Sequence, residues 1–179
     1  MTVTPVSGLR SAVTGLLFAG LLGAQSPDVF ITRQVRRPAF VNNRPLHFTM
    51  KAVSFVGGTA PFIAPFVIQG PEGRAEGRAV VAGWLTTSTL KFVFGRARPY
   101  AVADTNAGDF GWMRGRRSSE YRSMPSGHAT VAFAFAQPPA RSGANRAGMY
   151  SAASIVSLSR IYLDRHWTSD VLFGAAIGE

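Results

Sequence analysis

The sequence predicts an all-α helical bundle of about six helices, and three observations support this fold class. No stretch of the chain alternates apolar and polar residues as a half-buried strand does. The apolar residues instead form runs of helical length that stop at proline or glycine. With 179 residues, of which 46% are hydrophobic, the chain is long enough to form one core, so a single domain is expected.

The N-terminal half divides into an apolar leader and two helical regions. Residues 1–24 are expected to form a secretory signal peptide or an N-terminal anchor, because an apolar run follows Arg10 and ends on small residues. The domain proper is then residues 25–179. A short amphipathic helix is expected before Pro38. Residues 47–69 are apolar but interrupted by two glycines and two prolines, and residues 71–77 are expected to form a polar turn.

The rest of the chain, from residue 78 onward, contains four predicted helices. The first is long and is expected to end before Pro99, and a loop rich in glycine, aspartate and arginine follows over residues 100–124. This loop has two interpretations, a lid over a bound substrate or a solvated basic loop. The second helix stops at a pair of prolines. The four helices are expected at about residues 78–95, 126–137, 147–162 and 168–177.

Composition narrows the functional classes. The formal net charge is +10, from 19 Lys and Arg against 9 acidic residues. This balance favours an anionic partner, such as a phosphate, an anionic lipid headgroup or a nucleic acid. The chain has no cysteine, which excludes disulfides, thiolate zinc sites and cysteine nucleophiles.

The first chemically informative block is KFVFGRARP at residues 91–99. Lys91 and Arg98 are seven residues apart, which is two helical turns, so on one helix they share a face and can bind an anion together. Two separately solvated charges are the alternative interpretation.

The second block is PSGH at residues 125–128. Ser126 is a favourable N-cap, and Gly127 leaves room for a ligand beside the free N–H groups of the first turn. His128 is expected in that turn, facing the anion. An N-capped helix with an incidental histidine is the alternative.

The third block is SRIYLDRHWTSD at residues 159–170. His166 and Asp170 are four residues apart, so the carboxylate can accept a hydrogen bond from Nδ1–H and leave Nε2 nucleophilic. Arg160 can offer a two-pronged donor to phosphate oxygens. An ordinary surface pair is the alternative for this block alone.

In this order and spacing, K-x6-R-P, P-S-G-H and S-R-x5-H-x3-D, the chain resembles the type 2 phosphatidic acid phosphatase (PAP2) superfamily, which includes acid phosphatases and vanadate haloperoxidases. The resemblance covers residues 91–174 at least. It implies a helical bundle of that type, with His166 as nucleophile, His128 as proton donor and then base, and Asp170 orienting His166. It implies phosphoryl binding by the following residues: Lys91, Arg98, Ser126, Gly127 and Arg160.

The resemblance also implies a reaction and a location. The expected reaction is hydrolysis of a phosphate monoester or diphosphate through a phosphohistidine, with no metal and no cofactor. The expected substrate is a lipid phosphate: phosphatidate, phosphatidylglycerophosphate or a polyprenyl diphosphate. The expected location is the cell envelope, with membrane association and the site on the periplasmic or outer side, and no nucleic acid or obligate protein partner.

Two other functions remain open at this point. One is a vanadate-dependent haloperoxidase that uses the same anion pocket. The other is a basic non-catalytic module that binds anionic membrane or nucleic acid. The stretch between the second and third blocks is short for the superfamily, and Pro138 and Pro139 shorten a helix that is usually longer. These departures leave membrane spanning open.

Overall fold

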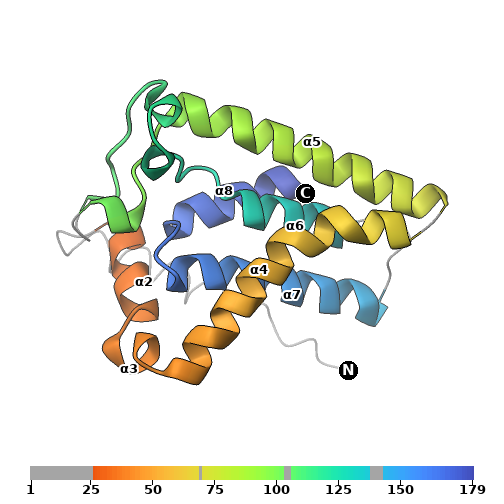
Figure 1. Ribbon diagram of the computed structural model, residues 1–179, viewed down its shortest axis with the longest axis horizontal. Helices are drawn as coiled ribbons and strands as arrows, with labels where there is room; N and C mark the ends of the chain where they lie inside the picture. The colour runs from red at the N-terminus through yellow and green to blue at the C-terminus, as the bar shows by residue number, and fades with distance from the viewer. Residues whose placement is uncertain (1–25, 69, 103–105, 138–142) are drawn as a thin grey trace, which may run out of the picture.

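The computed structural model describes residues 26–68, 70–102, 106–137 and 143–179, so the predicted signal or anchor at residues 1–24 lies outside the described residues. The described residues form seven α-helices and three short 3₁₀ turns, without a strand, which confirms the all-α class (Figure 1). The α-helices are α2 (Pro27–Val35), α3 (Pro38–Val41), α4 (Arg44–Val67), α5 (Pro71–Phe94), α6 (Gly127–Ala136), α7 (Gly143–Tyr162) and α8 (Thr168–Gly178). The 3₁₀ turns are η1 (Pro99–Ala101), η2 (Arg114–Arg116) and η3 (Ser119–Tyr121).

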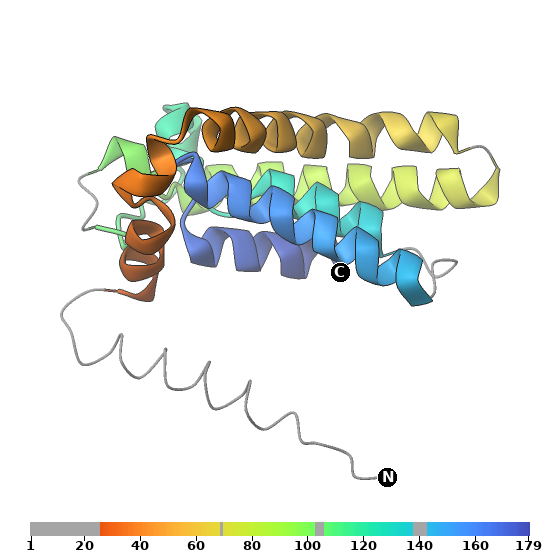
Figure 2. The ribbon, with the colours of Figure 1, turned by 90° about the horizontal axis from the view of Figure 1, so that it is seen from below.

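Helix α6 is the centre of the bundle. It packs against α4, α5, α7 and α8, and most of its ten residues are buried. A helix that is apolar on every side has to be surrounded by others, and its alanines let the neighbours come close. Figures 1 and 2 show α4 and α5 along one side of the bundle, with α7 and α8 on the other side of α6.

Close backbone contact holds α8 against α6. A Cβ on Gly174 would lie 2.4 Å from the carbonyl oxygen of Ser126, and one on Gly178 would lie 2.5 Å from that of Thr130. The Thr130 hydroxyl donates to the Gly174 carbonyl at 2.9 Å. This contact fixes the start of α6, where the PSGH block lies, relative to α8.

Two predictions in the N-terminal half were wrong. The apolar segment expected to be broken is one helix, α4, with Pro61 and Pro65 inside it. Residues 71–77, expected to be a turn, begin α5, with Pro71 in the first turn, where a missing N–H costs nothing. Gly73 is needed for packing here: a Cβ would lie 1.6 Å from the Ile68 carbonyl oxygen.

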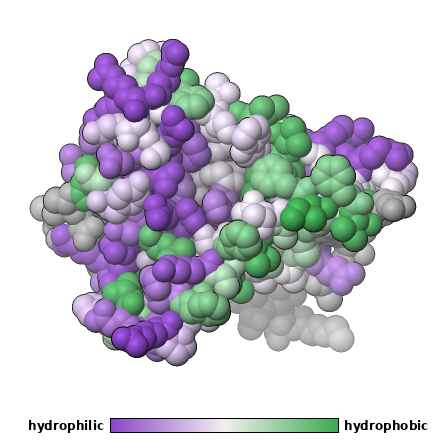
Figure 3. Space-filling view, in the orientation of Figure 1, coloured by the Kyte–Doolittle hydropathy of each residue, from purple (hydrophilic) through white to green (hydrophobic). Residues whose placement is uncertain are grey.

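The surface is divided into a polar end and an apolar side. Figure 3 shows hydrophilic residues over the end that holds α2, α3 and the 3₁₀ turns, and hydrophobic residues along α4 and the adjoining part of α5. Helix α4 is the one described helix that is long and apolar enough to cross a membrane, judged by length and composition. Its large exposed apolar side chains are Phe48, Phe55, Val56, Ile63, Phe66 and Val67.

Candidate active site

The start of α6 forms one wall of a cavity at the polar end of the bundle. Ser126 is the N-cap, with its Oγ accepting from the Ala129 N–H at 3.5 Å, and it is completely buried. The Ser126 N–H donates to the Asp170 carbonyl at 2.9 Å. Gly127 and His128 line the cavity. The predicted N-cap is confirmed, and free N–H groups at a helix start favour an anion there.

Three cations reach the cavity from three different segments. Lys91 lies in the last turn of α5, Arg160 lies in the last turn of α7, and Arg98 comes from the extended residue before η1. The expectation that Lys91 and Arg98 share one helical face was wrong, because α5 ends at Gly95 in the left-handed conformation, φ 52°. Both nevertheless line the same cavity. Gly95 is required here, since a Cβ would lie 2.0 Å from the Gly111 carbonyl oxygen.

The two histidines line the same cavity but come from different parts of the chain. His128 is in the first turn of α6, and His166 precedes α8, where it is 2% exposed. Nδ1 of His166 lies 3.6 Å from Oδ2 of Asp170, which is longer than a hydrogen bond. Because α8 begins at Thr168, His166 and Asp170 do not lie on one helix. Asp170 instead reaches back from the first turn of α8 to accept the Trp167 N–H at 2.9 Å, which brings its carboxylate beside His166.

The cavity has a volume of about 260 Å³, enough for a phosphoryl group and part of its leaving group. Six of the eight predicted site residues line it, while Ser126 and Asp170 are buried directly behind the lining. Its lining residues are Gly58, Phe62, Trp84, Thr87, Ser88, Lys91, Arg98, Gly127, His128, Val131, Arg160 and His166.

Burial and mutual repulsion disfavour positive charge at every cationic group of the cavity. Burial, and then Arg98, lowers the pKa of Lys91 to about 7 and that of Arg160 to about 10. Burial, and then Arg160, lowers the pKa of His128 to about 3. The pKa of His166 is also well below its ordinary value, from burial and then Lys91. Both histidines are therefore neutral at pH 7, and the negative charge of a bound dianion would offset the repulsion.

Several buried donors of residues that line the cavity have N–H groups without a hydrogen-bond acceptor. Among the described residues, Nε of Arg98 and Nε of Arg160 have no hydrogen-bond partner. Nζ of Lys91 donates to the carbonyls of Arg122 and Pro125, which leaves one of its three protons free. Buried donors are rarely left unpaired, so this arrangement indicates an anion with several oxygens.

Some residues of the site were missed at the sequence level. A Cβ on Gly58 would lie 2.5 Å from Nε2 of His128, so α4 needs glycine there. Phe62 and Trp84 also line the cavity and form an edge-to-face pair at 6.5 Å. The Gly57–Gly58 pair inside an apolar run was the available signal for a close contact.

The basic loop between the first two blocks does not line the cavity in its described part. Two of its arginines make local contacts: Arg114 stacks on Tyr121 at 4.0 Å and pairs with Asp109 at 2.8 Å, and Arg122 lies over Phe92 of α5. The described loop therefore does not support the lid interpretation. No group of three or more His, Asp or Glu side chains in the described ranges is placed to hold a metal ion.

Fold and site define a helical bundle in which the start of a central helix, three cations and two histidines surround one cavity of about 260 Å³. The model of the PAP2 superfamily matches residues 77–179, more than half of the chain, and the chain belongs to this superfamily.

Two relatives extend this comparison. The lipid A 1-phosphatase of Porphyromonas gingivalis is 36% identical over 109 residues, covering 58% of this chain and 20% of that protein, so the match spans about a fifth of the relative. The crystal structure of Aquifex aeolicus LpxE aligns with a TM-score of 0.64 at 22% identity, over 83% of this chain and 87% of that one. This second likeness concerns the fold.

Proposed function

We propose that the protein is a metal-independent phosphatase that acts on a lipid phosphate of the cell envelope. The observation that carries the proposal is the convergence of Lys91, Arg98 and Arg160 with two neutral histidines around one cavity of about 260 Å³. Three cations supply the charge stabilisation that a transferring phosphoryl group needs. The match to a lipid A 1-phosphatase supports the reaction class.

In the proposed reaction, Nε2 of His166 forms a bond to phosphorus as the P–O bond to the leaving alcohol breaks. His128 gives its proton to that oxygen. Water then attacks phosphorus, His128 takes a proton from it, and the P–N bond breaks to release inorganic phosphate. The first step needs a protonated His128, and the bound dianion favours that form because its negative charge offsets the repulsion that lowers the pKa of His128.

An apolar groove beside the cavity supports a lipid substrate. It has a volume of about 1000 Å³, lies between α4 and α5, and shares Phe62 with the phosphate cavity. Phe66, which is 84% exposed, lines it as well. A substrate with its phosphate on the cations could place its hydrocarbon part along this groove. We also propose that the apolar face of α4 associates with the membrane, with the site on the periplasmic or outer side.

A substrate panel in the presence of EDTA tests the proposal. The panel contains para-nitrophenyl phosphate, phosphatidate, phosphatidylglycerophosphate, a polyprenyl diphosphate and a lipid A 1-phosphate. We expect metal-free phosphate release from at least one lipid, lost by about 10³-fold or more in His166→Ala. His47→Ala is the matched control, because His47 is the one histidine outside the cavity.

Three results would contradict the proposal. They are no hydrolysis of any panel member, full activity in His166→Ala, or activity lost in EDTA and restored by magnesium. Peroxide-dependent halide oxidation after vanadate loading would favour the haloperoxidase alternative.

A further inference from the structure

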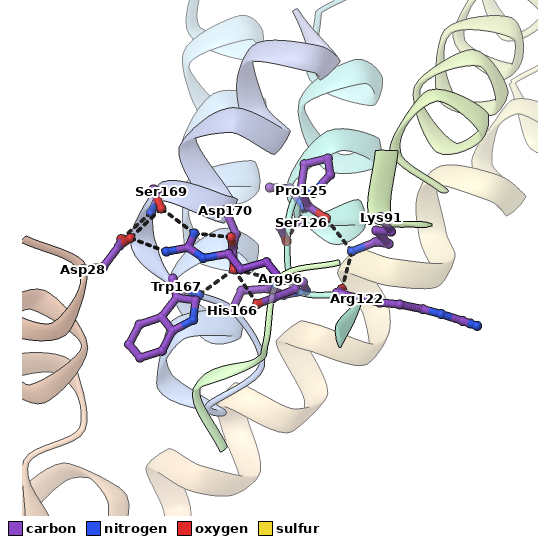
Figure 4. A network of polar contacts seen from close by, with 12 residues as sticks. Asp28, Lys91, Arg96, Arg122, Pro125, Ser126, His166, Trp167, Ser169 and Asp170 are labelled. Atoms are coloured by element: carbon purple, nitrogen blue, oxygen red, sulfur yellow. Dashed lines mark hydrogen bonds and ion pairs between the residues drawn. The ribbon is translucent and has the colours of Figure 1, made fainter. Parts of the chain in front are cut away.

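A buried arginine that does not line the cavity is bonded directly to the acid behind the nucleophile. Arg96 is 3% exposed, and all five of its N–H groups have acceptors. Its Nη1 donates to Oδ1 of Asp170 at 2.5 Å and to Oγ of Ser169 at 2.7 Å. Its Nη2 donates to Oδ2 of Asp28 at 2.7 Å (Figure 4). Its Nε donates to the carbonyl of Ala107 at 2.9 Å.

The carboxylate of Asp170 is held at both oxygens. Arg96 occupies Oδ1, while the Ser123 hydroxyl at 2.6 Å and the Trp167 N–H at 2.9 Å occupy Oδ2. Oδ2 is also the oxygen nearest to Nδ1 of His166. Arg96 therefore fixes the orientation of the Asp170 carboxylate beside His166 together with Ser123 and Trp167.

Arg96 in turn depends on a second carboxylate, which belongs to α2. Asp28 accepts from the Ser169 N–H at 2.7 Å and the Ser169 hydroxyl at 2.6 Å as well as from Arg96. The next residue, Val29, packs with the completely buried Trp167. Helix α2 thus contacts the first turn of α8 through both polar and apolar groups, although it lies outside the residues 77–179 that match the superfamily.

We propose that Asp28 and Arg96 are positioning residues, which with Ser169 and Asp170 form a tether that fixes His166 for attack. The inference rests on the proposed role of His166 as nucleophile. One guanidinium between two carboxylates leaves the tether with one net negative charge, and this charge favours the positive charge that grows on His166 as its Nε2 bonds to phosphorus. Loss of the Asp28 carboxylate removes that charge and one of the five hydrogen bonds that hold Arg96, while the phosphate-binding cations keep their own contacts.

Asp28→Asn tests the tether in the full-length protein, with Asp109→Asn as the matched control. Asp109 also pairs with an arginine, Arg114 at 2.8 Å, but lies outside the tether. We expect kcat to fall about tenfold in Asp28→Asn, with KM and the affinity for inorganic phosphate within twofold of wild type. Asp28→Glu should recover part of kcat, and Asp109→Asn should match wild type. Circular dichroism confirms that each variant is folded.

Two results for Asp28→Asn would overturn the inference. An equal loss of kcat and of phosphate affinity would show a merely structural role, and an unchanged kcat would show no role in positioning. Should Asp28→Asn fail to fold, Arg96→Lys replaces it, since it keeps the charge but loses the planar fork, and the same split is expected.

Imidazole nitrogen resonances separate this inference from the proposed function. The His166 signals, assigned with His166→Ala, should shift in Asp28→Asn and stay unchanged in Asp109→Asn, whether or not the protein is a phosphatase. Inactive wild-type protein would refute the proposed function, whereas unshifted His166 signals would refute the tether.

Discussion

Gly58 in α4 provides a specific test of the role of His128, because the atoms nearest to a Cβ at this position all belong to the His128 ring. A Cβ at this position would lie 2.5 Å from Nε2 of His128 and 2.9 Å from its Cδ2. Ordinary contact begins near 3.4 Å, so the imidazole must move by about 0.9 Å or more in Gly58→Ala. Displacements of about 1 Å in an active site can lower rates about 10²-fold.

Two other glycines serve as comparisons for Gly58→Ala. A Cβ on Gly57 would lie 2.2 Å from Cγ2 of Val156, so Gly57→Ala disturbs packing instead of the proton donor. A Cβ on Gly148, in α7, would meet nothing within 4 Å. We expect Gly57→Ala to lower stability by about 1–3 kcal/mol. Gly148→Ala should raise it by up to about 1 kcal/mol, because alanine favours helix.

The assay for this series combines steady-state kinetics with urea unfolding. Gly58→Ala should lose about 10²-fold in kcat while its free energy of unfolding stays within about 1 kcal/mol of wild type. The reasoning would be refuted by a Gly58→Ala protein with wild-type kcat, or by one whose activity falls only as far as its folded fraction does.

Two further predictions concern acid stability and the groove. Because the folded pKa of His128 is about 3, well below its ordinary 6.5, the unfolded chain binds more protons between these values. The free energy of unfolding should therefore decrease as pH falls below 6.5, by at most about 1.4 kcal/mol per pH unit for this residue. Urea unfolding at pH 7 and at pH 5 measures this decrease in the free energy of unfolding. The same decrease in His128→Ala would contradict the prediction. Separately, Phe66→Asp should weaken hydrolysis of long-chain lipid phosphates about tenfold and spare para-nitrophenyl phosphate; equal effects on both would count against the groove as the lipid site.

Local sequence patterns predicted those parts of the site that depend on short-range structure. Ser126 caps α6 because a hydroxyl before an apolar run can accept the free N–H groups of the first turn. The PAP2 resemblance implies phosphate binding by Lys91, Arg98 and Arg160, and the three residues line one cavity. Gly95 ends α5 before Arg98, and tertiary structure, not a shared helical face, brings Lys91 and Arg98 together.

Parts of the site that depend on contacts between distant residues could not be predicted. Asp28 and Arg96 are 68 residues apart, and nothing in either local pattern connects them. The same holds for Gly58 and His128, which meet only because α4 packs against α6. In α4, the two prolines signalled a break, yet packing against neighbouring helices outweighs their local cost.

Detection of a phosphohistidine at position 166 is the most direct test of the central claim. Wild-type protein is mixed with a labelled phosphate ester in EDTA, quenched in alkali to preserve phosphohistidine, digested and mapped by mass spectrometry. The account predicts label on the peptide that carries His166, formed as fast as turnover requires and absent from His166→Ala. Turnover without that label, or equal labelling of His166→Ala, would contradict it.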